Sequence, residues 1–107
     1  MDKGTVVCIT CQFKRGGFPS ERAFEIATPE GVVRGVADVE YCRRMNMEPL
    51  GEEPSTGHAI PGLLMGLVIR PLEGKNIRVH LPDGGVYDLD TSIIEPAREV
   101  VSRDVPV

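Results

Sequence analysis

The sequence has no tryptophan and few other aromatic residues, two tyrosines and three phenylalanines among 107 residues. An aromatic groove of the kind that captures proline-rich peptides is therefore not expected. No apolar run approaches the roughly 18 residues that cross a bilayer, so no membrane-spanning segment is expected. Residues 1–4 also lack the apolar stretch of a signal peptide.

Basic residues are not in excess, because twelve Lys and Arg stand against sixteen Asp and Glu, for a net charge of −4. A surface that binds duplex nucleic acid usually shows a basic excess or cluster, so a nucleic-acid partner is not expected. The step Arg43-Arg44 is too short to count as such a cluster. No phosphate-binding loop or dinucleotide fingerprint occurs, and no cofactor is expected.

The three cysteines are an odd number, which argues against a closed disulfide framework and favours a reducing compartment such as the cytoplasm. Cys8 and Cys11 form a C-x-x-C motif, a spacing found in zinc and redox sites. Here the motif lies inside an alternating segment, residues 5–14, and the odd spacing puts the two thiols on opposite faces of a strand. We expect small buried side chains that stay reduced and bind no metal.

Glycine and proline are plentiful, with twelve and nine residues, as in short strands joined by tight turns. The clearest pattern spans Lys75–Ile94, where apolar residues alternate with polar ones at Ile77, Val79 and Leu81. The turn Pro82–Gly85 then reverses the chain, with Gly84 expected at positive φ. This stretch predicts a β-hairpin.

The rest of the chain predicts further strands within a single domain, residues 1–107. Residues 48–61 form a long internal loop, in which Gly51 is expected to adjust freely, and residues 97–107 form a tail that docks or frays. Residues 38–47 fit either a helical turn or a 3₁₀ turn followed by a short strand through Tyr41 and Cys42. Residues 90–96 predict a 3₁₀ turn and a short last strand. The other predicted strands are residues 5–14, 21–27, 32–37 and 62–70.

A fainter copy of the hairpin pattern lies 53 positions earlier. Phe24-Glu25-Ile26 matches Ile77-Arg78-Val79, and Pro29-Glu30-Gly31 matches Pro82-Asp83-Gly84. The match fits two interpretations: two repeated three-stranded units around one core, or ordinary hairpin chemistry that occurs twice. Either way the sequence predicts an all-β small barrel of about six strands.

The run Leu67–Pro96 resembles the small barrels of the Src-homology-three, Tudor and KOW type. It has their order of strand, turn, strand, hairpin, strand, 3₁₀ turn and final strand, and it covers about a third of the chain. The resemblance implies the barrel fold. It does not imply peptide binding, because the aromatic residues for that groove are scarce.

The segment 62–70 is apolar on both faces of a strand. Leu63, Met65, Leu67 and Ile69 share one face, whereas Leu64 and Val68 share the other. One barrel interior accepts only one face, so we expect Leu64 and Val68 at the interface of a homo-oligomer, most simply a two-fold dimer. The alternative cover is the valine-bearing tail, residues 100–107.

Candidates for chemistry are few. His58 lies in the long loop, and Asp88 and Asp90 share one side of a strand, where paired carboxylates bind cations or act as acid and base. Solvated surface is the more common role of such residues, and His80 is expected to be exposed. Three hypotheses follow: a non-enzymatic module that self-associates and binds a protein partner, a nucleic-acid-associated barrel, and a small ligand-binding or hydrolytic barrel using these three residues. We favour the first.

Overall fold

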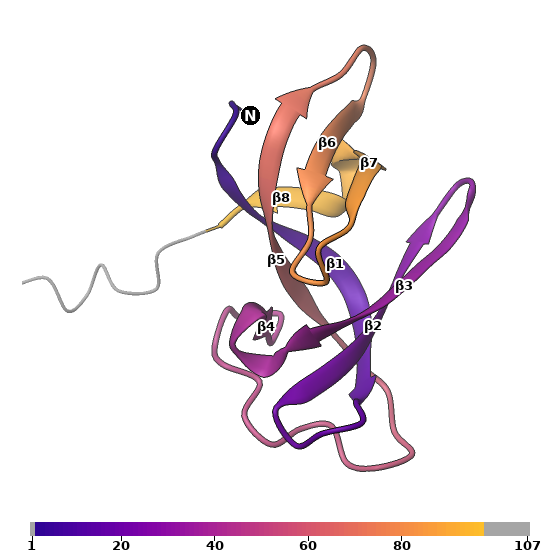
Figure 1. The fold of residues 1–107 in the computed structure, drawn as a ribbon, viewed down its shortest axis with the longest axis vertical. Helices are drawn as coiled ribbons and strands as arrows, with labels where there is room; N and C mark the ends of the chain where they lie inside the picture. The colour runs from indigo at the N-terminus through magenta and orange to yellow at the C-terminus, as the bar shows by residue number, and fades with distance from the viewer. Residues whose placement is uncertain (1, 98–107) are drawn as a thin grey trace, which may run out of the picture.

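The computed structural model describes residues 2–97, and most of the predicted tail, residues 98–107, lies outside this part. The described residues form antiparallel strands and two 3₁₀ helices, without an α-helix, in a sheet that curls into a half-barrel (Figure 1). This confirms the all-β fold. The elements are β1 (Val6–Arg15), β2 (Glu21–Thr28), β3 (Gly31–Asp38), η1 (Val39–Tyr41), β4 (Cys42–Arg43), β5 (Ile60–Pro71), β6 (Asn76–His80), β7 (Val86–Asp90), η2 (Thr91–Ile93) and β8 (Ile94–Pro96).

Six strands run across the sheet in the order β3-β2-β1-β5-β6-β7, as predicted in number. The two short strands lie off this path, β4 beside β5 and β8 beside β1. The segment 38–47 follows the second of its two interpretations: the Asp38 carboxylate accepts a hydrogen bond from the Glu40 amide at 3.0 Å and caps η1, and β4 follows. Because the Asp38 side chain satisfies this amide, a single 3₁₀ turn forms here without a longer helix.

The two halves of the chain have the same order of elements, β1 to β4 and β5 to β8. They meet where β1 pairs with β5, with Ile9 opposite Leu64. At this point Cys42 of β4 pairs with Leu64, and Ile94 of β8 pairs with Ile9. The short last strand of each half therefore completes the sheet beside the first strand of the other half.

The hairpins of the two halves differ in length, which explains why a fixed shift of 53 matches only a few positions. In β2–β3 the last pair is Thr28 with Gly31, whereas in β6–β7 it is His80 with Val86. The second hairpin therefore has the longer connection. The repeat exists in the fold even though the sequence spacing is not constant.

The main core lies on the inner face of the curled sheet, where Leu64 and Val68 are fully buried, with 0% and 1% of their surface exposed. Our assignment of the two faces of residues 62–70 was therefore wrong, and these two residues are not accessible to a second chain. Alternation shows that a strand has two faces but not which one faces inward. Leu64 faces inward because it pairs with Ile9, which also lies in the core.

The outer face of β5 is covered in part by the chain itself. Leu63 packs there with Cys8 and Met47, a residue of the loop that follows β4, and Met65 and Ala97 pack against them. Cys8 thus lies in this small outer cluster, whereas Cys11 lies in the main core, which confirms that the two thiols occupy opposite faces.

Burial keeps the thiols of Cys11 and Cys42 in their neutral form. The three cysteines are buried and form no disulfide with one another. Burial raises the pKa of Cys11, and it raises the pKa of Cys42 to about 12. At pH 8 the reactive thiolate of Cys42 is then on the order of 10⁻⁴ of the total. We expect a thiol reagent at pH 8 to label the native protein very slowly and to label three thiols at once in denaturant. Rapid labelling of the native protein would contradict this burial.

Candidate functional site

A row of exposed side chains crosses the outer face of four neighbouring strands. Val6 of β1 pairs with Leu67 of β5, Leu67 pairs with His80 of β6, and His80 pairs with Val86 of β7. Directly paired residues of antiparallel strands point to the same face. Their exposed fractions are 42% for Val6, 42% for Leu67 and 51% for Val86, and His80 is also exposed. We call these four residues the outer row.

A shallow groove of about 260 Å³ lies beside the outer row. It forms because β4 pairs with β5 only at Leu63 and Leu64, and β6 begins to pair with β5 at Leu67. Met65 and Gly66 lie between these two pairings, so neither β4 nor β6 pairs with them on that edge of β5. Apart from members of the outer row, the groove is lined by Tyr41, Met65, Gly66 and Pro82.

The equivalent gap in the other half of the fold has a different character. It lies on β1 between the residues that pair with β8 and those that pair with β2, and its cavity measures about 210 Å³. Gln12 and Glu25 contribute polar groups to its wall, and the side chain of Glu25 pairs with Arg34 at 2.8 Å. The apolar groove beside β5 is therefore not a general property of the repeat.

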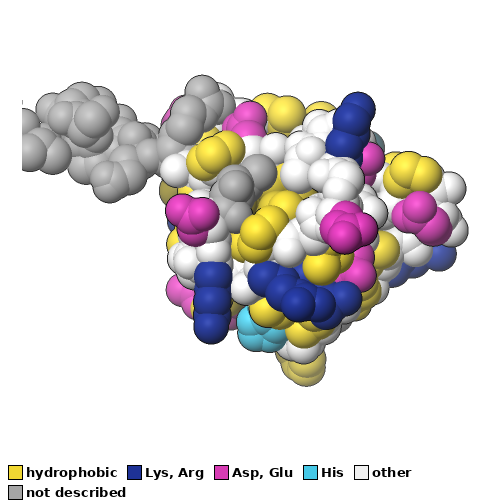
Figure 2. Space-filling view, turned by 90° about the horizontal axis from the view of Figure 1, so that it is seen from above, with side chains coloured by type: hydrophobic (Ala, Val, Ile, Leu, Met, Phe, Trp, Pro, Cys, Tyr) yellow, Lys and Arg dark blue, Asp and Glu magenta, His cyan; other side chains and the backbone are white. Residues whose placement is uncertain are grey.

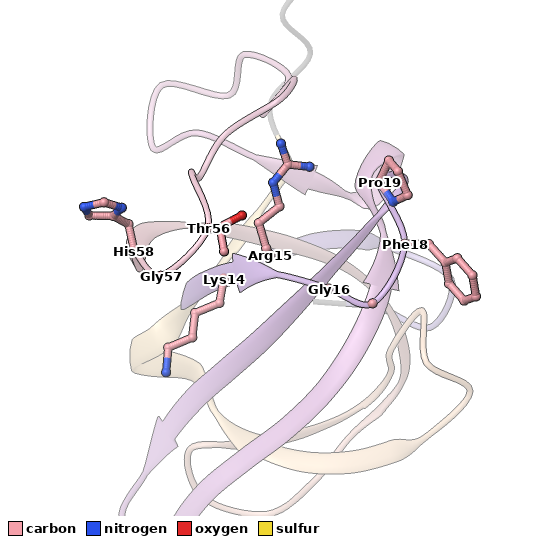
Figure 3. Close-up of a pocket in the computed structure, with 9 residues that line it drawn as sticks. Lys14, Arg15, Gly16, Phe18, Pro19, Thr56, Gly57 and His58 are labelled. Atoms are coloured by element: carbon pink, nitrogen blue, oxygen red, sulfur yellow. The ribbon is translucent and has the colours of Figure 1, made fainter.

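A larger cavity, of about 530 Å³, lies at the far end of β1 (Figure 3). One wall is the segment Lys14–Pro19, and the other is Thr56–His58 of the long loop. Figure 3 shows Lys14, Arg15 and His58 pointing in different directions around it, with Phe18 on the far side of its own loop. The structure thus places the predicted candidate His58 at a cavity.

Arg22 joins the loop that forms one wall of this cavity to Gly51 and Glu53, which precede the other wall in the long loop. Its side chain is fully buried, with 1% exposed, and donates hydrogen bonds to four main-chain carbonyls. Pro19 and Glu21 accept on one side, at 2.7 Å each. Gly51 at 2.8 Å and Glu53 at 2.7 Å accept on the side of the long loop. Burial, and next the nearby charge of Arg15, lower the pKa of Arg22.

The predicted carboxylates have structural partners instead. Asp88 accepts two hydrogen bonds from Arg78, at 2.8 and 3.1 Å, and Asp90 caps η2 by accepting from the Ser92 amide at 2.7 Å. These hydrogen bonds lower the pKa of both carboxyl groups. The cavity lined by His58 includes neither of them, so the structure does not gather the three candidates around it. Among residues 2–97 no three metal-binding side chains form a group.

Sequence reasoning missed the outer row and Arg22 for different reasons. The outer row depends on which strands are neighbours, and no single strand contains that information. Arg22 did leave a signal, because alternation puts it on the same inward face as Phe24 and Ile26. An arginine at a core position predicts a buried guanidinium that needs hydrogen-bond acceptors.

Comparison with protein-family models, with curated proteins and with solved structures finds no match to this chain. The fold and its surfaces therefore define it only as a small all-β half-barrel. No helix within the described range is long and apolar enough to cross a membrane. On the face seen from above, hydrophobic side chains lie between basic and acidic ones, without a broad area of one charge (Figure 2).

Proposed function

We propose that the protein is a non-enzymatic interaction module that self-associates through the outer row. The observation that carries the proposal is the continuity of Val6, Leu67, His80 and Val86 across four strands. Scattered single apolar residues are normal on a protein surface, whereas contiguous ones mark an interaction site. The expectation of self-association stays a proposal, now on the opposite face of β5 from the one first considered.

The order of side chains in the row suits a second copy of the same chain. A two-fold axis through the middle of the row would set Val6 against the partner's Val86. It would also set Leu67 against the partner's His80. Such a closed contact uses one patch twice, and it places no histidine against a histidine. If the chain does not self-associate, the alternative occupant of the outer row is a different protein that presents an apolar surface.

The interface is expected to be weak and reversible. Complete burial of a valine or leucine contributes roughly 1.5–3 kcal/mol. Val6, Leu67 and Val86 are already about half buried in one chain, so each gains roughly 1 kcal/mol. Association also costs several kcal/mol of lost translational and rotational freedom. Two copies therefore gain roughly 6 kcal/mol before this cost, so we expect a weak dimer that dissociates between about 100 μM and 1 mM.

Sedimentation of a charged variant tests the proposal. Leu67→Glu places a carboxylate in the centre of the row, and we expect it to sediment as a folded monomer at concentrations where the wild type is dimeric. Val36→Glu is the matched control, because Val36 of β3 is exposed to nearly the same extent, 44% against 42%. The control should remain dimeric, since Val36 lies outside the row.

A cross-linking experiment covers the case in which Leu67→Glu does not fold. The double variant Val6→Cys, Val86→Cys should form disulfide-linked dimers under mild oxidation. Val6→Cys alone should form few, because the axis does not bring two copies of that position together. A wild-type protein that is still monomeric at about 2 mM would contradict self-association and favour a different occupant of the row.

A further inference from the structure

His80 is the ionisable member of the outer row, whose other members are the apolar Val6, Leu67 and Val86. It pairs with Leu67 on one side and with Val86 on the other, so its ring lies between two apolar side chains on the outer face. In a single chain the His80 side chain is exposed, so water solvates the ring whether or not it carries a proton. Any surface that covers the row must accept this ring together with its apolar neighbours.

The charged groups beside His80 do not favour a second positive charge there. Arg78 lies two positions earlier on the same face of β6, and its guanidinium binds the Asp88 carboxylate of β7 at 2.8 and 3.1 Å. Arg70 of β5, which pairs with Arg78, is a further positive charge near Asp88. Two arginines and one carboxylate therefore leave a net positive charge next to the ring.

The other ionisable groups near the ring do not supply a counter-charge. Asp83, in the turn after β6, accepts hydrogen bonds from the Gly85 amide at 2.8 Å and from the Tyr87 hydroxyl at 3.2 Å. Tyr87 and the outer row lie on opposite faces of β7, because side chains alternate along a strand. Tyr41 of η1 contributes a phenol, uncharged at neutral pH, to the groove beside the row, and no carboxylate of the described residues lines that groove. A protonated His80 is thus a cation without an anionic partner.

We propose that His80 makes self-association through the outer row dependent on pH: two chains associate while the ring is neutral and separate when it is protonated. The inference rests on the proposed function, whose two-fold contact sets His80 against the partner's Leu67. An apolar side chain covers a neutral imidazole at little cost, whereas a cation covered in this way loses its water and gains no partner. Each dimer contains two such rings, so two protons oppose its formation.

The direction of the pH effect separates this proposal from the general effect of net charge. The chain carries a net charge of −4 at pH 7, so two copies repel each other. As the pH falls, carboxylates and imidazoles bind protons and this repulsion decreases. Net charge alone therefore predicts tighter association at lower pH, whereas protonation of His80 predicts weaker association.

Sedimentation equilibrium of the full chain at pH 7.5 and pH 5.5 tests the proposal. Histidine side chains ordinarily titrate near pH 6.5, so we expect the dissociation constant of the dimer to rise by roughly 10- to 100-fold between these two values. The slope of its logarithm against pH should approach about two protons per dimer at the acid end. Circular dichroism at both pH values shows whether the chain stays folded.

The histidine count of the chain provides a matched control, because His58 is the only other one and lies in the long loop, outside the outer row. His58→Gln should keep the pH dependence of the wild type. His80→Gln should associate at pH 5.5 at least as tightly as at pH 7.5. His80→Leu should do the same, and it covers the case in which glutamine weakens the contact at both pH values.

Wild-type association that is equal or tighter at pH 5.5 would overturn the pH switch and leave self-association intact. A His80→Leu dimer that weakens at pH 5.5 as much as the wild type would also overturn it, because another group would then be the one that titrates. A wild-type chain that is monomeric at pH 7.5 and about 2 mM would contradict the proposed function itself, and the switch with it.

Discussion

Arg22→Ala is expected to lower the free energy of unfolding by about 3 kcal/mol, because a buried side chain that satisfies several carbonyls disappears at once. Arg22 is the largest fully buried side chain, and it connects the Gly16–Pro19 loop to Gly51 and Glu53 across the chain. Its loss leaves these carbonyls without their donor beneath the long loop. Urea unfolding followed by circular dichroism measures the change.

Two variants separate this effect from a general loss of positive charge. Arg34→Ala removes an arginine that is 69% exposed and forms a surface ion pair, so it should cost less than about 1 kcal/mol. Arg22→Lys keeps the charge but not the planar fork of donors, and should fall between the other two. Equal urea midpoints for Arg22→Ala and Arg34→Ala would show that the guanidinium does not hold the loop.

Gly62→Ala is expected to cost about 3 kcal/mol, the upper end of ordinary overpacking in a core. A β-carbon at Gly62 would lie 2.6 Å from the Arg43 carbonyl oxygen and 2.6 Å from the Phe13 ring. Phe13 is fully buried, and the carbonyl belongs to β4, so neither neighbour moves freely. The substitution therefore has to displace β4 from β5. Thermal unfolding of the purified variant gives the cost.

Gly57→Ala serves as the comparison, because Gly57 has a positive φ of 85° but nothing within 4 Å of its absent β-carbon. Gly57→Ala should lower the free energy of unfolding by only about 1 kcal/mol, the cost of placing alanine at a positive φ. A Gly62→Ala protein as stable as Gly57→Ala would show that the close approach of β4 and β5 relaxes easily. The contrast thus distinguishes steric crowding from backbone conformation.

The strands were predictable from the sequence because each depends on local alternation, and the Lys75–Ile94 hairpin is the clearest case. The inward face of β5 was not predictable in this way. Leu64 and Leu67 are equally apolar, and only their pairing with β1 distinguishes them. The backbone conformation was predicted correctly for one glycine and not for another. Gly84 has the expected positive φ of 89°, but Gly51, expected to adjust freely, also has a positive φ of 67°.

The candidate surfaces were harder to predict than the fold, because each joins residues distant in sequence. His58 was named, but its neighbours Lys14 and Arg15 belong to the end of β1. The pairing of β1 with β5, in which Phe13 lies opposite Ile60, brings those segments together. Asp88 and Asp90 followed a valid local pattern, yet their roles are those of an ion-pair partner and a 3₁₀ cap.

The pairing of each half's last strand with the other half's first strand has a consequence for synthesis. The partner of Val7 in β8 is Pro96, near the end of the described chain, and its partner in β5 is Gly66. The Gln12–Arg15 end of β1 pairs with β2 as soon as β2 has been made, but in a chain emerging from the ribosome residues 7–9 have no neighbouring strand until β5 and β8 have been translated. Such distant pairings are slow to form. Completion of the sheet around the first residues of β1 is thus a late event that awaits translation of the second half.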